Sequence, residues 1–300
     1  MLDLVIESRP RDLGGGLAVG RVLPFVRRRM VGPFIFLDHM GPAAFQPGQG
    51  IDVRPHPHIG LATVTYLFDG EIHHHDNLGF SQKIFPGEVN WMTAGSGIVH
   101  SERTDPSLRS SGGLMHGMQA WVALPREDEE TAPGFAHHGV EALPELSAPG
   151  LWARLIAGSA YGLHNNVKTF SPLFYLHVEL DQGARLALPA EHAERAVYVV
   201  SGTVTHEGTH YPAGRMLVFA AGGEPVVTAE DGSARLMLLG GANIGSRFIW
   251  WNLVSSRQER IEQAKADWKS GRMSLPPDDN SEFIPLPEDP PLAHEPTHPV

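Results

Sequence analysis

Residues 54–70 read RPHPHIGLATVTYLFDG and residues 87–102 read GEVNWMTAGSGIVHSE. Each stretch carries one pair of polar side chains two positions apart, which are His56 with His58 and His100 with Glu102. Both pairs stand in runs typical of β-strands, where side chains at positions i and i+2 point to the same face. Each pair therefore offers two donor groups on one side of a sheet. Two such pairs facing each other would make a four-ligand metal site.

This donor set predicts the kind of metal. Imidazole with one carboxylate suits iron, manganese, nickel, copper, zinc or cobalt, whereas magnesium and calcium favour all-oxygen shells. Four unrelated polar residues are the competing interpretation, which the paired spacing disfavours. We therefore expect one transition-metal ion, held by His56, His58, His100 and Glu102.

The rest of the chain has the pattern of an all-β protein. Glycine and proline divide it into short segments rich in β-branched and aromatic residues, including 63–68, 89–93, 118–124, 174–180 and 216–220. Short strands at regular spacing, with turn residues between them, predict an antiparallel sandwich or barrel.

The two quoted stretches resemble the two metal motifs of a cupin. The first has His-x-His and a glycine that ends the strand, and the second has a strand, a Gly-rich turn and a histidine. An ordinary cupin carries a carboxylate ligand seven positions before the closing glycine, here Gly70, and Thr63 occupies that position. We expect Glu102 to supply the missing carboxylate instead.

This relocated carboxylate closely resembles the pattern of the pirin family, as do VGPFIFLDHMGP at 31–42 and WWNLVSS at 250–256. The resemblance covers nearly the whole chain. It implies two cupin barrels of the double-stranded β-helix, or jelly-roll, type. It also implies iron, most simply Fe(II), in the N-terminal barrel.

A boundary between the barrels is predicted near residue 125, where PREDEETAPGFAHHG is rich in charged and turn residues. We expect an N-terminal cupin with the metal site over 1–135 and a second cupin over 136–300. The second half repeats the strand pattern but has no histidine pair where ligands would stand. It is therefore predicted to lack a metal site, with His192, His206 and His210 as surface or packing residues.

The C-terminal segment has a helical pattern. Ser256 and Glu259 have the spacing of a capping box, and Gly271 is a stop signal after apolar residues at helical spacing. These signals predict one short helix over about 256–270. The tail from Leu275 is rich in proline and acids, and we expect it to wrap the surface or to be partly disordered.

Composition excludes several classes of function. The chain has 300 residues, no cysteine and a formal net charge of −11. Thiolate ligands, disulfides and thiol-based sensing are therefore excluded, and general nucleic-acid binding is disfavoured. A long apolar segment is absent from the sequence, so we expect a cytoplasmic protein without membrane insertion. The cluster Arg27 to Arg29 is interpreted as a solvated or salt-bridged strand edge rather than an anion site.

Other motifs have simpler interpretations. Gly14 to Gly16 is predicted to be a turn rather than a phosphate loop, since no βαβ pattern surrounds it. Gly95 to Gly97 lacks half of a nucleophile elbow. A triad through Ser101 fails because neighbouring strand residues point to opposite faces. The run His73 to Asp76 is either a second metal cluster or a polar loop near the barrel mouth, and we favour the loop.

The resemblance also implies an activity. Bacterial pirins are associated with quercetin 2,3-dioxygenase activity, which inserts O2 into the flavonol heterocycle and releases a depside and carbon monoxide. A metal in a barrel keeps coordination positions open toward the mouth, which suits a small phenolic substrate and O2. Glu102 could then accept the hydroxyl proton as a base.

Two other classes compete with this enzyme. Pirins are also associated with binding partner proteins, either a transcription factor or a metabolic enzyme, with the iron acting as a redox sensor. The four ligands would be the same in both cases. A metal-dependent isomerase or epimerase on the same scaffold is a third class, which the family resemblance disfavours.

Overall fold

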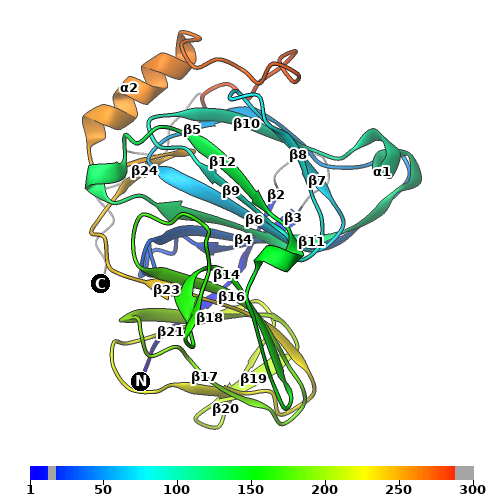
Figure 1. Ribbon diagram of the computed structural model, residues 1–300, viewed down its shortest axis with the longest axis vertical. Coiled ribbons are helices and arrows are strands. Elements are labelled where there is room, and N and C mark those ends of the chain that lie inside the picture. Colours follow the sequence, from blue (N-terminus) through cyan, green and yellow to red (C-terminus); the bar gives the residue numbers. More distant parts are fainter. Residues whose placement is uncertain (13–17, 288–300) are drawn as a thin grey trace.

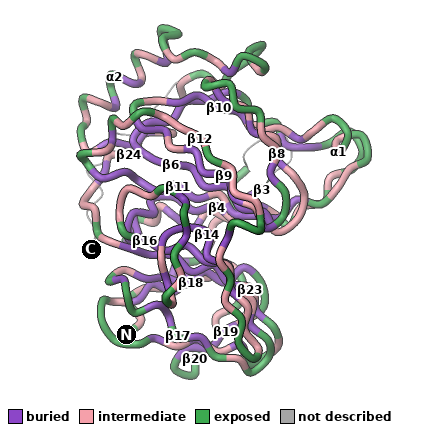
Figure 2. The backbone as a smooth tube through the Cα atoms, viewed as in Figure 1, coloured by how far each residue is buried: buried purple, intermediate pink, exposed green. Residues whose placement is uncertain are grey.

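The computed structural model describes residues 1–12 and 18–287, and these form two β-barrels stacked one above the other (Figure 1). The predicted all-β fold of two cupin barrels with a short C-terminal helix is confirmed. In the part of the chain described, Figure 2 shows most strands buried along much of their length.

The upper barrel in Figure 1 consists of a seven-stranded and a four-stranded antiparallel sheet. The first has the strand order β12-β9-β6-β11-β4-β3-β2 and the second has the order β5-β10-β7-β8. Their bounds are β2 (Arg9–Asp12), β3 (Ala18–Leu23), β4 (Phe34–Phe45), β5 (Asp52–His58), β6 (Leu61–Asp69), β7 (Ile72–Asp76), β8 (Ser81–Ile84), β9 (Val89–Thr93), β10 (Ile98–Arg103), β11 (Gly113–Ala123) and β12 (Gly134–His138). The short helix α1 (Pro106–Ser111) joins β10 to β11.

The lower barrel has an eight-stranded sheet and a second four-stranded sheet. It comprises β1 (Leu2–Glu7), β13 (Glu145–Ala148), β14 (Leu151–Ala160), β15 (Leu163–His164), β16 (Leu173–Leu180), β17 (Arg185–Ala187), β18 (Glu194–Ser201), β19 (Thr203–His206), β20 (Thr209–Pro212), β21 (Arg215–Phe219), β22 (Val226–Thr228) and β23 (Ala234–Gly241). The hairpin of β24 (Phe248–Trp250) and β25 (Leu253–Ser255) and the helix α2 (Gln258–Lys269) follow. Turns of 3-10 helix lie at Arg126–Asp128 and Val140–Ala142.

The alternation in β6 shows how the barrels pack together. Its residues Val64 and Tyr66 belong to a core cluster that also contains Tyr175 and Tyr198 of the lower barrel. Thr63 and Thr65 point to the opposite face, into the upper barrel, because successive strand residues alternate. One strand therefore supplies both the packing between the barrels and part of the lining of the upper one.

Each end of the chain pairs with the barrel that the other half of the chain forms. Strand β1 pairs with β21 of the lower barrel, with Val5 opposite Leu217. At the other end, Leu253 of β25 forms a parallel bridge with Ile59 of the upper barrel. The division into two cupins near residue 135 stays a proposal. The two pairings show in addition that each barrel uses one element from the opposite end of the chain.

The helix α2 buries Ile261, Ala264 and Trp268 on one face and ends before Gly271, whose φ of 72° fits the predicted stop. The predicted capping box is wrong. The N-cap position is Arg257, without a side-chain cap bond. The backbone N–H and the hydroxyl of Ser256 instead donate to the buried carboxylate of Glu129, at 2.7 and 3.0 Å.

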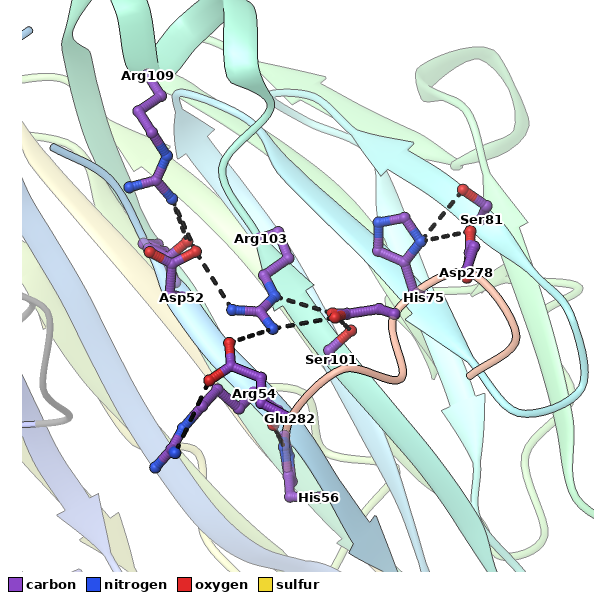
Figure 3. Close-up of polar contacts among 12 residues, drawn as sticks. Asp52, Arg54, His56, His75, Ser81, Ser101, Arg103, Arg109, Asp278 and Glu282 are labelled. Carbon is purple, nitrogen blue, oxygen red and sulfur yellow. Dashed lines mark hydrogen bonds and ion pairs between the residues drawn. The ribbon is translucent and has the colours of Figure 1, made fainter. Parts of the chain in front are cut away.

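Residues 274–287, which we call the C-terminal strap, return across the outside of β5 and β10. Figure 3 shows the polar contacts that hold the strap, centred on Arg103, which donates to Asp279 at 2.8 Å and to Glu282 at 3.0 Å. The backbone N–H of Ile284 donates to the carbonyl of Pro55 at 2.9 Å. The described part of the tail thus wraps the surface, as expected.

Neither helix in the described part of the chain is long and apolar enough to cross a bilayer. The turn predicted at Gly14 to Gly16 lies outside the described residues.

Candidate metal centre

Three of the predicted ligands meet inside the upper barrel. Strands β5 and β10 pair antiparallel, with His56 opposite His100 and His58 opposite Ile98. The ring centroids of His56 and His100 lie 4.4 Å apart, and one ligand atom from each of the three imidazoles lies within 4.8 Å of the others. This is the only such donor group within residues 1–12 and 18–287.

Hydrogen bonds fix the ring orientation of the two histidines on β5. The Nδ1 of His56 donates to the carbonyl of Arg54 at 2.8 Å, and the Nδ1 of His58 donates to the carbonyl of Asn252 at 3.1 Å. A carbonyl can only accept, so each Nδ1 carries the proton and each Nε2 keeps a free lone pair. A metal requires that lone pair.

His100 is oriented by two residues of β7. Its Nδ1 lies 3.4 Å from the Nδ1 of His74, whose Nε2 donates to the carboxylate of Asp76 at 2.9 Å. Asp76 is held in turn by the backbone N–H groups of Leu78 and Phe80. The Nε2 of His100 is buried and has no hydrogen-bond partner among the described residues. Buried polar atoms are rarely left unpaired, so this orphaned nitrogen fits a metal ligand.

The run His73 to Asp76 is therefore a strand, and the prediction of a polar loop is wrong. In β7 the side chains of His74 and Asp76 are buried, whereas His73 and His75 lie nearer the surface. The alternation of the strand separates the run into an inward pair that supports His100 and an outward pair.

Burial also sets the protonation of the three imidazoles. It lowers the pKa of His56 to about 4, and it holds the pKa values of His58 and His100 well below the ordinary value. Neighbouring imidazoles add to this effect. The rings are therefore neutral near pH 7, which is the form that binds a metal.

Glu102 lines the cavity into which the three histidines project. It does not belong to the group of donors that lie within 4.8 Å of one another, which contains the histidines only. The register of β5 and β10 shifts between His100 and Glu102, where β5 carries an extra residue, so Glu102 faces Val53. Burial raises its pKa to about 7, and a hydrogen bond with Thr65 acts in the opposite direction. The assignment of Glu102 as fourth ligand stays a prediction.

The cluster opens into a cavity of about 460 Å³. Trp121 stacks on Phe36 at 4.0 Å between ring centroids and lies steeply inclined to the ring of His58, at 5.1 Å between centroids. The apolar part of the lining is formed by Pro24, Phe36, Met40, Ile51, Val53, Ile72, Trp121, Ile249, Trp251 and Ile284. A cavity of this size and character suits a small aromatic molecule.

Several residues of this cavity were not found from the sequence. Trp251, Asn252 and Ile284 come from the C-terminal hairpin and strap. On the polar side, Arg21 forms a bidentate pair with the buried Asp38, at 2.9 and 2.8 Å. Asp38 is the one acidic residue in the largely apolar stretch 31–42, and this was the only sequence signal that could have pointed to it.

The other motifs agree with their simpler interpretations. Gly95 has φ +51°, as a turn requires, and an added Cβ would lie 2.0 Å from the carbonyl of Thr131. Ser101 points away from His100 and donates to Asp279 of the strap. His192 and His206 are buried against backbone carbonyls, and His210 is an exposed partner of Asp231, at 3.1 Å.

Two cupin barrels, with one buried histidine cluster in the first, define a bicupin whose described residues hold a single candidate metal centre. Residues 16–122 match the family model described as Pirin, and residues 175–274 match the model described as the Pirin C-terminal cupin domain. The chain belongs to the pirin family.

Individual relatives agree with this assignment. A pirin-like protein of Caulobacter vibrioides is 60% identical over 291 residues, which cover 96% of this chain and 100% of the relative. A Pseudomonas aeruginosa protein, provisionally named a quercetin 2,3-dioxygenase, is 38% identical over 89% of this chain and 83% of its own length. The crystal structure of quercetin 2,3-dioxygenase from Acinetobacter baumannii superposes with a TM-score of 0.89 at 30% identity, covering 98% of this chain and 97% of that one.

Proposed function

We propose that this protein is an iron-dependent dioxygenase that opens the heterocycle of a flavonol-like phenol such as quercetin with O2. The observation that carries the proposal is the cluster of three neutral imidazoles at an aromatic cavity. The names of the Pseudomonas and Acinetobacter relatives support the choice of reaction.

His56, His58 and His100 would hold the metal through Nε2, with Glu102 as the fourth ligand or as a base beside it. Bound Fe(II) would supply the redox chemistry that lets an electron-rich phenol react with O2. The same donors accept zinc, manganese, nickel, copper and cobalt, so metal content is measured first.

The protein's own residues would do three things in this reaction. The stacked pair of Trp121 and Phe36 presents an apolar wall against a planar ring and excludes water. A carboxylate with a pKa of about 7, as burial gives Glu102, can accept a hydroxyl proton near neutral pH. The strap residue Ile284 covers part of the cavity.

The test is oxygen uptake by iron-reconstituted protein given quercetin, with His56→Ala as control. We expect uptake to follow quercetin loss one for one and to vanish in the variant, which should lose most of its metal but keep its fold. A protein that holds iron and consumes no oxygen would contradict the proposal.

That negative result would favour the second candidate, a cytoplasmic regulator that changes its affinity for a partner protein when its iron is oxidised. The ligands would be the same in both cases. The enzyme is preferred because the cluster faces a cavity of about 460 Å³ with aromatic side chains in its wall, which a sensor of oxidation state does not need.

A further inference from the structure

One cation in the wall of the cavity, Arg29, has no partner among the described residues. Arg29 lies between β3 and β4 and lines the same cavity as the three imidazoles. Its Nε is buried without a hydrogen bond, and neither a hydrogen bond nor an ion pair joins its guanidinium to any described residue. Its neighbour Arg28 differs, since it pairs with Asp3 at 2.6 Å.

The acidic groups of the cavity do not neutralise Arg29. Asp38 is occupied by the two-point contact with Arg21. Neither a hydrogen bond nor an ion pair joins Glu102 to Arg29, although both line the cavity. A guanidinium remains protonated at any ordinary pH, although burial lowers the pKa of Arg29. Its positive charge is therefore left without a counter-charge by the part of the chain that the structure describes.

An uncompensated guanidinium that is partly removed from water is unfavourable unless a ligand pairs with it. Arginine binds planar carboxylates through parallel N–H bonds. A ligand that reaches both the histidine cluster and Arg29 would therefore combine a metal-binding oxygen group with an anionic one. A cavity of about 460 Å³ accommodates such a molecule.

We propose that Arg29 is the anion-binding residue of this cavity and that the natural substrate is a polyphenol bearing a carboxylate. The diol would lie at His56, His58 and His100, and the carboxylate would pair with Arg29. This inference rests on the proposed function, which it narrows from flavonol-like phenols to acidic ones. The sequence-based interpretation of Arg27 to Arg29 as a solvated or salt-bridged edge then holds for the exposed Arg27 and for Arg28, which pairs with Asp3, but not for Arg29.

The test is calorimetric titration of the metal-loaded protein, without oxygen, with matched pairs of ligands. Each pair is a catechol acid and its uncharged amide, with the acid on the ring, one carbon away or on a two-carbon side chain. We expect at least one acid to bind about tenfold more tightly than its amide, as one charge-assisted hydrogen bond provides. Arg29→Met should remove this preference, and Arg29→Lys should keep part of it.

Arg27→Met is the matched control, since it removes the same charge from an exposed position in the same run. Thermal unfolding of each variant checks that the fold is intact. Equal binding of acid and amide in every pair, or an unchanged preference in Arg29→Met, would overturn the inference.

Benzoate, which lacks the diol, separates this failure from failure of the proposed function. If no catechol binds but benzoate binds in an Arg29-dependent manner, the anion site stands and the phenol substrate is wrong. If the amides bind, and if Arg29→Met changes the affinity of neither benzoate nor the acids, the phenol substrate stands and the anion site is wrong.

Discussion

At the scale of single residues, the geometry of the candidate metal centre depends on residues that hydrogen-bond to the three histidines as well as on the histidines themselves. His100 is held by His74, and His74 is held by Asp76. Partners of this kind set which nitrogen carries the proton and so keep the other free for metal.

His74→Phe tests this support. The ring fits beside Phe135, on which His74 already stacks at 4.3 Å, but the contact to His100 is lost. We expect metal affinity to fall roughly 10- to 100-fold, measured by competition with a chelator. His73→Ala, from the outward side of β7, should leave affinity unchanged. Equal affinity in both variants would show that His74 only fills space.

Glu102→Gln tests the second role of the carboxylate. The amide keeps the shape and one oxygen, so we expect the variant to retain part of its metal. It cannot accept the substrate proton, so turnover of quercetin should be lost. Metal content and oxygen uptake are measured on the same sample, and undiminished uptake would remove the role as base.

At the scale of elements, the C-terminal strap contributes Ile284 to the lining of the cavity and is held mainly by charges. Asp279 accepts from Arg103 at 2.8 Å and from Ser101 at 2.6 Å. Asp279→Ala should therefore release the strap while both barrels stay folded. The expected result is faster proteolysis within 274–287 and weaker quercetin binding, with little change in the global unfolding temperature.

A matched control is Asp231→Ala, which breaks an exposed contact with His210 on the lower barrel. It should change neither proteolysis nor binding. Proteolysis of Asp279→Ala at the rate of the unmodified protein would show that the backbone bond of Ile284 and the packing of the strap suffice without the charges.

The elements also show where sequence analysis succeeds and where it ends. The histidine pairs could be predicted because strand alternation is local and needs no knowledge of packing. Asn252 and Ile284 could not, since they reach the cavity only after the chain has folded back over the upper barrel. Arg29 was missed because a run of arginines gives no sign of which member lacks a partner. The capping box failed because the distant Glu129 takes the hydroxyl of Ser256.

At the scale of the whole molecule, a polar contact crosses between the barrels. His39 of β4 is hydrogen-bonded through Nδ1 to the hydroxyl of Tyr198 of β18, at 3.0 Å, and through Nε2 to His116, at 2.8 Å. Burial, with a smaller contribution from His116, lowers the pKa of His39 to about 4.

This shift predicts how stability depends on pH. An unfolded histidine has a pKa of about 6.5, so between that value and about pH 4 the unfolded chain binds the proton and the folded protein does not. The free energy of unfolding is therefore fully retained above pH 6.5 and declines as the pH falls toward 4. Denaturant unfolding of metal-free protein should show a shallower decline for His39→Phe than for the unmodified chain. An identical slope in the two proteins would contradict this account, and His210→Phe serves as the exposed control.

The exchange of chain ends also orders events during synthesis on the ribosome. His58 depends on the carbonyl of Asn252 for its orientation, and 194 positions separate the two residues. An emerging first barrel therefore lacks that acceptor until most of the chain has been translated. The orientation of His58 is therefore fixed only after residue 252 has been synthesised, which is after the second barrel. We expect metal to be loaded after that point.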